Sequence, residues 1–290
     1  MIYGNKVSLV IPVYNEPESI KDVISGAKSV EEVDEIIVVD DGSTDNTGEV
    51  LSSIEGIQVI SHPYNLGNGA SVKSGIRAAS GDVVVMMDAD GQHSPLDLPE
   101  ILLYLNDYDM VIGSRYGVKN SSKFRGFGNR ILIVIANFLS NSDIKDLTSG
   151  FRAIKRTKIL EFLHLLPNKF SYPTTSILAF LHSGYTIKYV TMKNFKKRIK
   201  GKSSIKPFRD GVRFIQIILR MVMLFNPQKI FIPVSLLFLF SGTGMVIWNI
   251  YLTKGIQESS VLLLILGVFL FFFGLLAEQI SSLRREIRKI

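Results

Sequence analysis

Residues 83–92 read Val-Val-Val-Met-Met-Asp-Ala-Asp-Gly-Gln, an apolar run that ends in two carboxylates and an amide. The run is typical of a buried strand, and residues two apart on a strand point the same way, so Asp88 and Asp90 can face one ligand. Gln92 adds a neutral oxygen. Such oxygen ligands suit Mg²⁺ or Mn²⁺, ions that usually bridge to substrate phosphates. A diphosphate-bearing substrate is therefore the first hypothesis, and the alternative is that both aspartates only cap a turn or a helix.

Similar polar clusters follow other predicted strands in the first part of the chain. Apolar runs alternate with helical patterns there, and the runs lie at 7–11, 36–39, 58–60, 83–87 and 109–112. This alternation is typical of βαβ units and predicts an α/β fold with a mainly parallel sheet. Ligands in such sheets bind beyond the carboxyl ends of the strands. We therefore expect the polar clusters after Ile11, Val39 and Met87 to share one cleft.

Helix signals lie between these strands. We place Asn15 at the N-cap of the first helix, with Pro17 in its first turn. Further helices are predicted from about residue 69 to 79 and from about 131 to 139. Asp40 and Asp45 lie in a turn cluster, where turn and cap roles suit them better than ligand binding.

Two apolar stretches near the C-terminus are long enough to cross a membrane. Residues 230–253 and 259–277 contain no charged residue, and at about 1.5 Å per residue each helix matches a bilayer core of roughly 30 Å. A pair of buried core helices is the alternative. Residues 262–266 and 269–273 leave no polar face, which favours two transmembrane helices.

Basic residues at the outer ends of these spans predict their orientation. Lys229 precedes the first span, and Arg284, Arg285, Arg288 and Lys289 follow the second, whereas the loop between the spans carries one base and one acid. By the positive-inside rule, we expect an integral membrane protein with both termini and the catalytic part in the cytoplasm. The chain opens directly into a strand, so we expect no secretory signal.

Composition limits the remaining classes. With 290 residues, 47% hydrophobic and 20% charged, the chain has enough apolar residues for one sizeable domain and an appendage. The net charge of +7 owes much to lysines and arginines between residues 193 and 213. No pattern for base recognition accompanies them, so anionic lipid headgroups explain them better than nucleic acid. The absence of Cys excludes disulfides and thiol catalysis.

The segment before the first span is amphipathic. Arg209, Arg213, Gln216 and Arg220 recur at helical spacing on an otherwise apolar stretch, residues 208–225. This pattern predicts a helix that lies in the membrane interface with its basic stripe toward the headgroups. A soluble amphipathic helix that covers the sheet is the alternative.

Three polar clusters together resemble glycosyltransferase family 2, whose nucleotide-sugar domain has the GT-A fold. They are Pro12-Val-Tyr-Asn-Glu16, Asp40-Asp-Gly-Ser-Thr-Asp45 and Asp88-Ala-Asp-Gly-Gln92. The likeness covers roughly the first 205 residues. The later segments 113–115, 146–152 and 198–203 are similar to the polyprenyl-phosphate branch, which contains dolichyl-phosphate mannose synthases and undecaprenyl-phosphate glucosyltransferases.

The predicted organisation follows from this resemblance and the apolar spans. We expect a GT-A domain over residues 1–205, a juxtamembrane amphipathic helix over 206–228, and a two-helix transmembrane hairpin with a short basic tail over 229–290.

The resemblance also implies site residues. The nucleotide sugar is expected on Pro12, Tyr14, Glu16, Val39, Asp41, Asp88, Ala89 and Asp90. Asp90 and Gln92 are expected to ligate Mg²⁺ or Mn²⁺, and Asp88, a further metal candidate, to meet the sugar or ribose. The residue types are compatible, because Asp41 can accept a hydrogen bond from a base or ribose and Tyr14 offers a stacking face.

Cations are expected to hold the acceptor phosphate. Many family members that glycosylate hydroxyls carry a Glu-Asp pair as general base, and no such dipeptide occurs here. A lipid phosphate is already ionised at pH 7 and needs cations instead. The resemblance points to Arg115 and Arg198, with Arg130 and Lys202 beside them, and makes Asp90, Arg115 and Arg198 the catalytic set. Arg152 is a further cation in this half of the chain, and Arg130 has the alternative of a solvated surface charge.

The implied reaction is inverting transfer of a hexose from a nucleotide diphosphate sugar to polyprenyl phosphate. Mannose from GDP-mannose and glucose from UDP-glucose both fit, as do dolichyl and undecaprenyl acceptors, and a homo-oligomer is compatible. Residues 172–176 lack the acidic residue that the family pattern leads us to expect. A processive polysaccharide synthase is one alternative, but the single tryptophan, Trp248, lies in a span and not in a Gln-x-x-Arg-Trp motif. A non-catalytic nucleotide-binding membrane scaffold is another, and the intact motifs disfavour it.

Overall fold

The structure, a computed structural model, describes residues 4–114, 132–138, 140–169, 171–195, 207–252 and 255–287. The chain divides into two compact units, Met1–Ile217 and Ile218–Ile290, with the division inside helix α8 (Pro207–Phe225). The domain boundaries predicted at residues 205 and 228 stay predictions.

The first unit alternates strands and helices as expected. Its elements are β1 (Val7–Val13), α1 (Pro17–Lys28), β2 (Glu35–Asp40), α2 (Thr47–Ser52), β3 (Gln58–Ser61), α3 (Asn68–Ala78), β4 (Val83–Met86), the 3₁₀ helix η1 (Pro95–Asp97), α4 (Leu98–Leu102), β5 (Met110–Ser114), β6 (Arg152–Lys155), α6 (Arg156–Phe162), α7 (Tyr172–His182) and β7 (Ile187–Thr191). Residues 132–138 are also helical.

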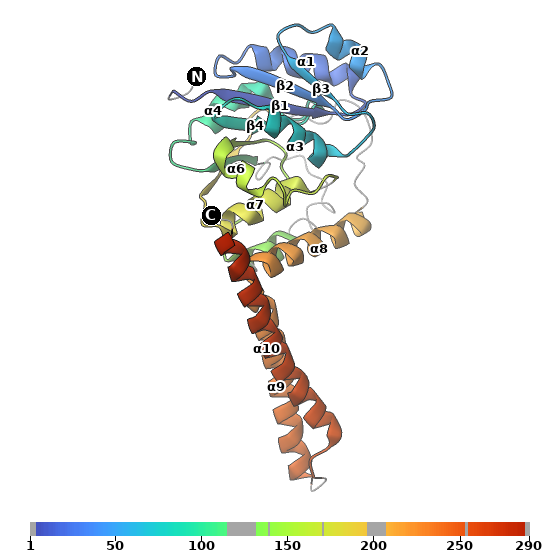
Figure 1. Ribbon diagram of the computed structural model, residues 1–290, viewed down its shortest axis with the longest axis vertical. Helices are drawn as coiled ribbons and strands as arrows, with labels where there is room; N and C mark the ends of the chain where they lie inside the picture. The colour runs from blue at the N-terminus through green and yellow to red at the C-terminus, as the bar shows by residue number, and fades with distance from the viewer. Residues whose placement is uncertain are drawn as a thin grey trace. The chain divides into compact units, whose positions relative to one another are not determined.

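These strands form one seven-stranded sheet in the order β3-β2-β1-β4-β6-β5-β7. Figure 1 labels β1 to β4 of this sheet. The chain runs outward from β1 to β3 and then returns to place β4 on the other side of β1, with β1 parallel to both β2 and β4. The strand order therefore reverses between β1 and β4, which is where ligands bind in open α/β sheets. The predicted α/β fold with a mainly parallel sheet is confirmed.

Side chains of β1 alternate between the two faces of the sheet. Leu9 and Ile11 belong to the apolar core that also contains Ile20 and Ile24 of α1. Val10 faces α3, where a Cβ added at Gly75 would meet its Cγ1 at 2.2 Å. Glycine at residue 75 therefore lets α3 approach the sheet closely enough to cover this face.

Two local expectations need correction. The N-cap of α1 is Glu16, not Asn15. Asn15 instead adopts φ of +54° and accepts a hydrogen bond from the backbone N–H of Thr44 at 2.8 Å, so its side chain faces the neighbouring loop. The region after residue 115, where no sheet was predicted, supplies β6 and β7, and β6 runs antiparallel to β4 and β5.

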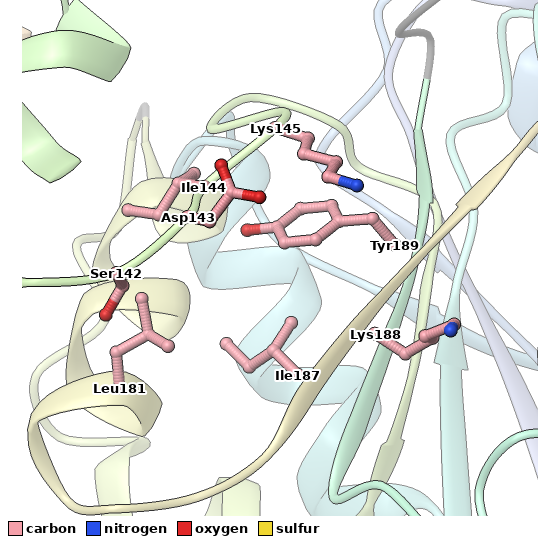
Figure 2. Close-up of a pocket in the computed structure, with 8 residues that line it drawn as sticks. All are labelled: Ser142, Asp143, Ile144, Lys145, Leu181, Ile187, Lys188 and Tyr189. Atoms are coloured by element: carbon pink, nitrogen blue, oxygen red, sulfur yellow. The ribbon is translucent and has the colours of Figure 1, made fainter.

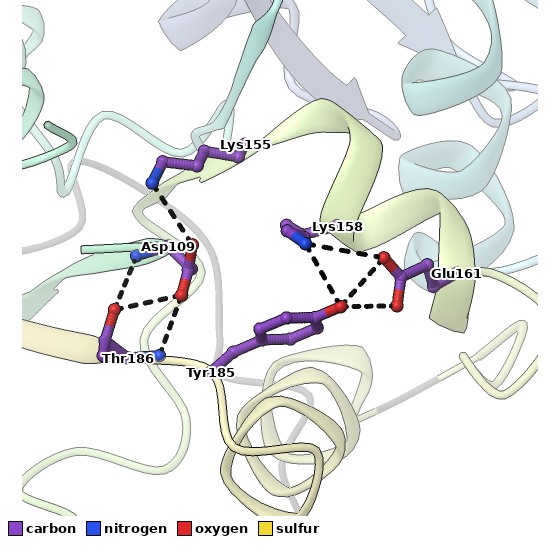
Figure 3. Close-up of polar contacts among 6 residues, drawn as sticks. All are labelled: Asp109, Lys155, Lys158, Glu161, Tyr185 and Thr186. Atoms are coloured by element: carbon purple, nitrogen blue, oxygen red, sulfur yellow. Dashed lines mark hydrogen bonds and ion pairs between the residues drawn. The ribbon is translucent and has the colours of Figure 1, made fainter. Parts of the chain in front are cut away.

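Polar contacts join the strands at the edge where β5 begins (Figure 3). Asp109 accepts from the Thr186 backbone N–H at 3.0 Å and from Lys155 Nζ at 3.2 Å. Burial opposes ionisation of Asp109, but these hydrogen bonds outweigh it and lower the pKa of its carboxyl group. Nearby, the Tyr185 hydroxyl donates to Glu161 at 2.7 Å and Lys158 lies over the Tyr185 ring. This cluster fixes β5, β6 and β7 at their shared end.

The second unit contains the helices α9 (Gln228–Tyr251) and α10 (Glu258–Ile287), which pack along each other (Figure 1). Ser235 Oγ donates to the Gly267 carbonyl at 2.7 Å, and Asn249 Nδ2 donates to Ser260 Oγ at 3.1 Å. Both helices are long and apolar enough to cross a membrane, and most of their apolar residues are exposed. A helical pair with an apolar outer surface and polar groups turned inward suits a bilayer.

Candidate active site

The carboxyl ends of β1, β2 and β4 meet at one edge of the sheet. Pro12 pairs in register with Val39, and Val10 pairs with Met86. The loops that follow these strands therefore leave the sheet side by side. The polar clusters of residues 12–16, 40–45 and 88–92 thus lie at the same edge of the sheet, as the predicted cleft requires.

Hydrogen bonds join the first two of these loops. The Asn15 backbone N–H donates to Ser43 Oγ at 3.0 Å, and the Glu16 N–H donates to Thr47 Oγ1 at 3.1 Å. Asp40 accepts from the Ser43 N–H at 3.0 Å, and Asp45 accepts from the Thr47 N–H at 3.0 Å. Asp40 and Asp45 therefore have the turn role predicted for them, whereas the N-cap of α2 is Asn46, which has no side-chain cap hydrogen bond.

The side chains predicted to meet the nucleotide differ in exposure. Pro12 and Val39 are buried within the sheet, whereas Tyr14 is 41% exposed and Glu16 is half-buried. The Glu16 carboxylate accepts from Ser19 Oγ at 3.3 Å. Tyr14 thus offers an accessible aromatic face at the end of β1.

Asp41 is held by a loop that the sequence pattern did not link to it. Its carboxylate is buried and accepts from the backbone N–H groups of Leu66 at 3.0 Å and Gly67 at 2.7 Å. His62 Nδ1 lies 2.8 Å from Asp41 Oδ1. These partners follow Asp41 by more than 20 residues and carry no local signal, so only the fold identifies them.

The carboxylates after β4 lie in a tight turn. Asp90 Oδ1 accepts from the Gln92 backbone N–H at 3.1 Å, and Gly91 adopts φ of +68°. Asp88, Asp90 and Gln92 are half-buried, whereas Ala89 is buried. Asp90 therefore has the turn role that was the alternative to ligand binding. The turn also keeps Asp88, Asp90 and Gln92 together just beyond the end of β4.

These residues fit a divalent cation that is shared with a substrate. No group of three or more His, Cys, Asp or Glu residues that could hold a metal occurs within the described ranges. Mg²⁺ usually binds through one or two carboxylates plus water and substrate phosphates. Asp88, Asp90 and Gln92 supply two carboxylates and an amide oxygen, which matches that mode of binding and not an all-protein cage.

Gly150, in the segment that leads into β6, packs against Asp88. A Cβ added at Gly150 would lie 2.4 Å from Asp88 Oδ2, so the backbone there touches the carboxylate. Arg152 is fully buried and donates to the Pro173 carbonyl at 3.0 Å, to Ser176 Oγ at 2.7 Å, and to the Ser149 carbonyl. Burial lowers the pKa of Arg152, which nearby tyrosines and the charges of Asp146 and Asp88 oppose. Arg152 is thus part of the wall behind Asp88 and does not reach solvent.

Four predicted cations lie outside the described residues. They are Arg115, Arg130, Arg198 and Lys202. Their contact with an acceptor phosphate stays a prediction.

A cavity of about 320 Å³ lies elsewhere in the first unit (Figure 2). It is lined by Ser142, Asp143, Ile144, Lys145, Leu181, Ile187, Lys188 and Tyr189. Burial raises the pKa of Tyr189, whose hydroxyl has no hydrogen-bond partner among the described residues. None of the predicted site residues lines this cavity, so it is separate from the cluster at the ends of β1, β2 and β4.

Comparison with protein families gives two matches along the chain. Residues 8–163 match the model for glycosyl transferase family 2, and residues 226–283 match the GtrB C-terminal hairpin. The first match contains all three polar clusters. The second coincides with most of α9 and α10.

Similar proteins carry related names. The chain is 28% identical to glycosyltransferase AglJ of Haloferax volcanii, over 98% of this chain and 96% of that protein. It is 35% identical to a dolichol-phosphate mannosyltransferase of Pyrococcus furiosus, over 69% of this chain and 59% of that protein. A Proteus mirabilis undecaprenyl-phosphate 4-deoxy-4-formamido-L-arabinose transferase is 30% identical over 60% of this chain and 59% of that protein. The chain thus spans nearly all of one relative and about three fifths of the other two.

Solved structures agree on the fold. Glucosyl-3-phosphoglycerate synthase of Mycobacterium tuberculosis, in complex with Mn²⁺, UDP-glucose and phosphoglyceric acid, superposes with a TM-score of 0.61 at 24% identity. The match covers 76% of this chain and 80% of that one. At this identity the likeness concerns the fold alone, and it confirms the expected GT-A type.

The resemblance seen in the sequence is therefore confirmed, both for the family and for relatives named after polyprenyl phosphates. The family match covers more than half of the 290 residues and contains the ends of β1, β2 and β4. This chain belongs to glycosyl transferase family 2.

Proposed function

We propose that this glycosyltransferase moves a hexose from a nucleotide diphosphate sugar to a polyprenyl phosphate at the cytoplasmic face of a membrane. Relatives named for dolichol phosphate and undecaprenyl phosphate support the acceptor class. Mannose from GDP-mannose and glucose from UDP-glucose are the proposed donors.

One observation carries this proposal: the loops after β1 and β2 and the loop after β4 lie at the same edge of the sheet. Asp41 and Tyr14 follow β2 and β1, which pair in register, and Asp88 and Asp90 follow β4 on the other side of β1. A nucleotide sugar needs both neighbourhoods, one for its base and ribose and one for its diphosphate. The strand order reverses between β1 and β4, so one donor can span them.

Each residue has a proposed task in donor binding. Tyr14 stacks on the base, and Pro12, Glu16, Val39 and Asp41 border the base and ribose. Asp90 and Gln92 hold Mg²⁺ or Mn²⁺, while Asp88, with Ala89 beside it, faces the sugar or ribose. A bound divalent cation would supply Lewis-acid stabilisation of the charge on the leaving diphosphate.

The acceptor side needs no general base. A polyprenyl phosphate is ionised at pH 7, and its oxygen attacks the anomeric carbon as the bond to the diphosphate breaks, with inversion. Arg115 and Arg198, joined by Arg130 and Lys202, are proposed to hold the acceptor phosphate, because guanidinium groups pair bidentately with phosphate oxygens. The positive charges of these side chains would orient the attacking phosphate oxygen.

The membrane part of the proposal depends on α8, α9 and α10. Both α9 and α10 have the length and apolar composition of membrane spans. The basic residues that flank them in sequence favour both termini in the cytoplasm. Helix α8, which the sequence predicts to lie in the interface, would keep the site near the lipid phosphate.

The proposal is tested by incubating membranes that contain the full chain with Mg²⁺ or Mn²⁺, a labelled donor, and dolichyl or undecaprenyl phosphate. We expect an acid-labile glycolipid with one of the donors, and none after Asp90→Ala. A chain that makes no lipid product with either donor, or an Asp90→Ala variant that makes it at the wild-type rate, would contradict the proposal.

A further inference from the structure

We infer that His62 and Ser74 are positioning residues that hold Asp41 in the orientation needed to bind the nucleotide donor. His62 Nδ1 lies 2.8 Å from Asp41 Oδ1, and His62 Nε2 lies 2.9 Å from Ser74 Oγ. The three residues come from three segments: Asp41 follows β2, His62 follows β3, and Ser74 lies in α3. This inference rests on the proposed role of Asp41 in donor binding.

The chemistry of the partners fixes the hydrogens in this chain of contacts. A carboxylate can only accept, so His62 Nδ1 carries the hydrogen that Asp41 receives. In a neutral imidazole, Nε2 is then an acceptor, and the Ser74 hydroxyl must donate to it. Asp41 therefore fixes the tautomer of His62, and Ser74, which donates to Nε2, holds the imidazole ring in place.

The Asp41 carboxylate has little capacity left for other partners. Its Oδ1 accepts from His62 and from the Leu66 N–H, and its Oδ2 accepts from the Gly67 N–H at 2.7 Å. A carboxylate offers about four lone-pair sites, so among the described contacts one remains, on Oδ2. Fixing Oδ1 with two donors thus determines the direction in which Oδ2 can accept from a ligand.

Burial strengthens this arrangement. The side chains of His62 and Asp41 are 9% and 4% exposed. Hydrogen bonds are stronger where water is excluded, and an unpaired buried polar group is correspondingly unfavourable. The His62 backbone N–H also donates to the Asp40 carbonyl at 2.8 Å, which ties the loop of residues 62–67 to the end of β2.

The same three residue types act as a nucleophilic triad in hydrolases, and the surroundings argue against that role here. Ser74 lies inside α3, which runs from Asn68 to Ala78. The backbone N–H groups around it belong to the helix and cannot form an oxyanion hole beside its hydroxyl. The chain of contacts therefore orients Asp41 and does not activate Ser74.

The test compares full-length variants in membranes, using whichever of UDP-glucose and GDP-mannose the wild-type enzyme accepts. His62→Leu removes the donor to Asp41, and we expect it to raise the KM for the sugar nucleotide roughly tenfold, with the KM for polyprenyl phosphate unchanged. His62→Asn restores an N–H near the Nδ1 position and should recover most of the affinity. Ser74→Ala should give an intermediate loss.

Thr186→Val is the matched control. Thr186 bonds Asp109 at the opposite end of the strands, so its loss should lower the melting temperature without changing the KM for the donor. If His62→Leu and Ser74→Ala behave like this control, or if His62→Asn is no better than His62→Leu, the inference is wrong. A wild-type enzyme that neither binds nor uses a sugar nucleotide would instead overturn the proposed function, and the inference with it.

Discussion

Asp88 shows how a site residue depends on contacts that local sequence does not reveal. The Asp-x-Asp pattern after an apolar run predicted two carboxylates just beyond a buried strand, and both residues follow β4. The pattern could not predict that Gly150, far along the chain, would touch the Asp88 carboxylate. It also could not separate Arg152, which is buried behind Asp88, from cations that could reach a phosphate. Residue types predict chemistry, whereas burial depends on the whole fold.

The contact with Gly150 gives a prediction at this scale. Gly150→Ala would place a methyl group 2.4 Å from Asp88 Oδ2, so the carboxylate or the backbone must move. We expect kcat/KM for the sugar nucleotide to fall roughly tenfold or more, because small displacements of site groups have large effects on rate. Steady-state kinetics of the full chain checks this.

Gly48→Ala is the control for that prediction. A Cβ there meets nothing closer than Asp40 Oδ2 at 3.7 Å, an ordinary contact, and residue 48 lies in α2. We expect normal kinetics and equal or slightly higher stability. Normal kinetics in Gly150→Ala as well would mean that the packing against Asp88 is not needed for activity.

At the scale of elements, the periodic segments were predictable and the irregular ones were not. The strands β1 to β5 and helix α3 fall within a few residues of their expected positions. Strand β6 was missed because it begins with a buried arginine in place of an apolar run. The N-cap of α1 was misplaced because Asn15 bonds Thr44 across the loops and not its own helix.

The polar cluster around Asp109 predicts a pH dependence at this scale. Folding lowers the pKa of the Asp109 carboxyl below its unfolded value near 3.8. The ionised carboxylate therefore stabilises the fold at any pH above 3.8, and this stabilisation is lost as the pH falls through the folded pKa. Asp109→Asn should lower stability by about 1–2 kcal/mol at pH 7. The melting temperatures of the wild type and of Asp109→Asn, measured in detergent, should differ by a constant amount from pH 7 to pH 5. Below pH 5 the two melting temperatures should converge. A difference that persists unchanged at the lowest pH would contradict this account.

For the whole molecule, the uneven distribution of apolar residues predicted one sizeable domain followed by two membrane spans. The helices α9 and α10 and the matched C-terminal hairpin agree with the apolar spans. The sugar and the lipid remained open in the sequence because a few contacts in the donor and acceptor sites decide them. Arg115 and Arg198, the cations proposed to hold the acceptor phosphate, lie outside the described residues, so their role is predicted from motifs only.

Truncation tests whether donor binding and use of the lipid acceptor depend on different parts of the chain. Removing residues 230–290 should impair transfer to long-chain polyprenyl phosphate much more than binding of the sugar nucleotide, because the donor residues all precede the spans. Donor binding is measured by calorimetry, and transfer is measured with long- and short-chain acceptors. Equal loss of donor binding and of transfer would contradict this division.

The proposed reaction requires above all that the carboxylates after β4 hold a divalent cation during sugar transfer to a lipid phosphate. The direct measurement is the rate of glycolipid formation by the full chain as a function of Mg²⁺ or Mn²⁺ concentration, in the wild type and in Asp90→Asn. We predict transfer that requires the cation in the wild type, and in the variant a rate lower by roughly 100-fold or more, as expected when charge stabilisation in the transition state is lost. Full activity in the presence of a strong chelator, or an unchanged metal dependence in Asp90→Asn, would contradict it.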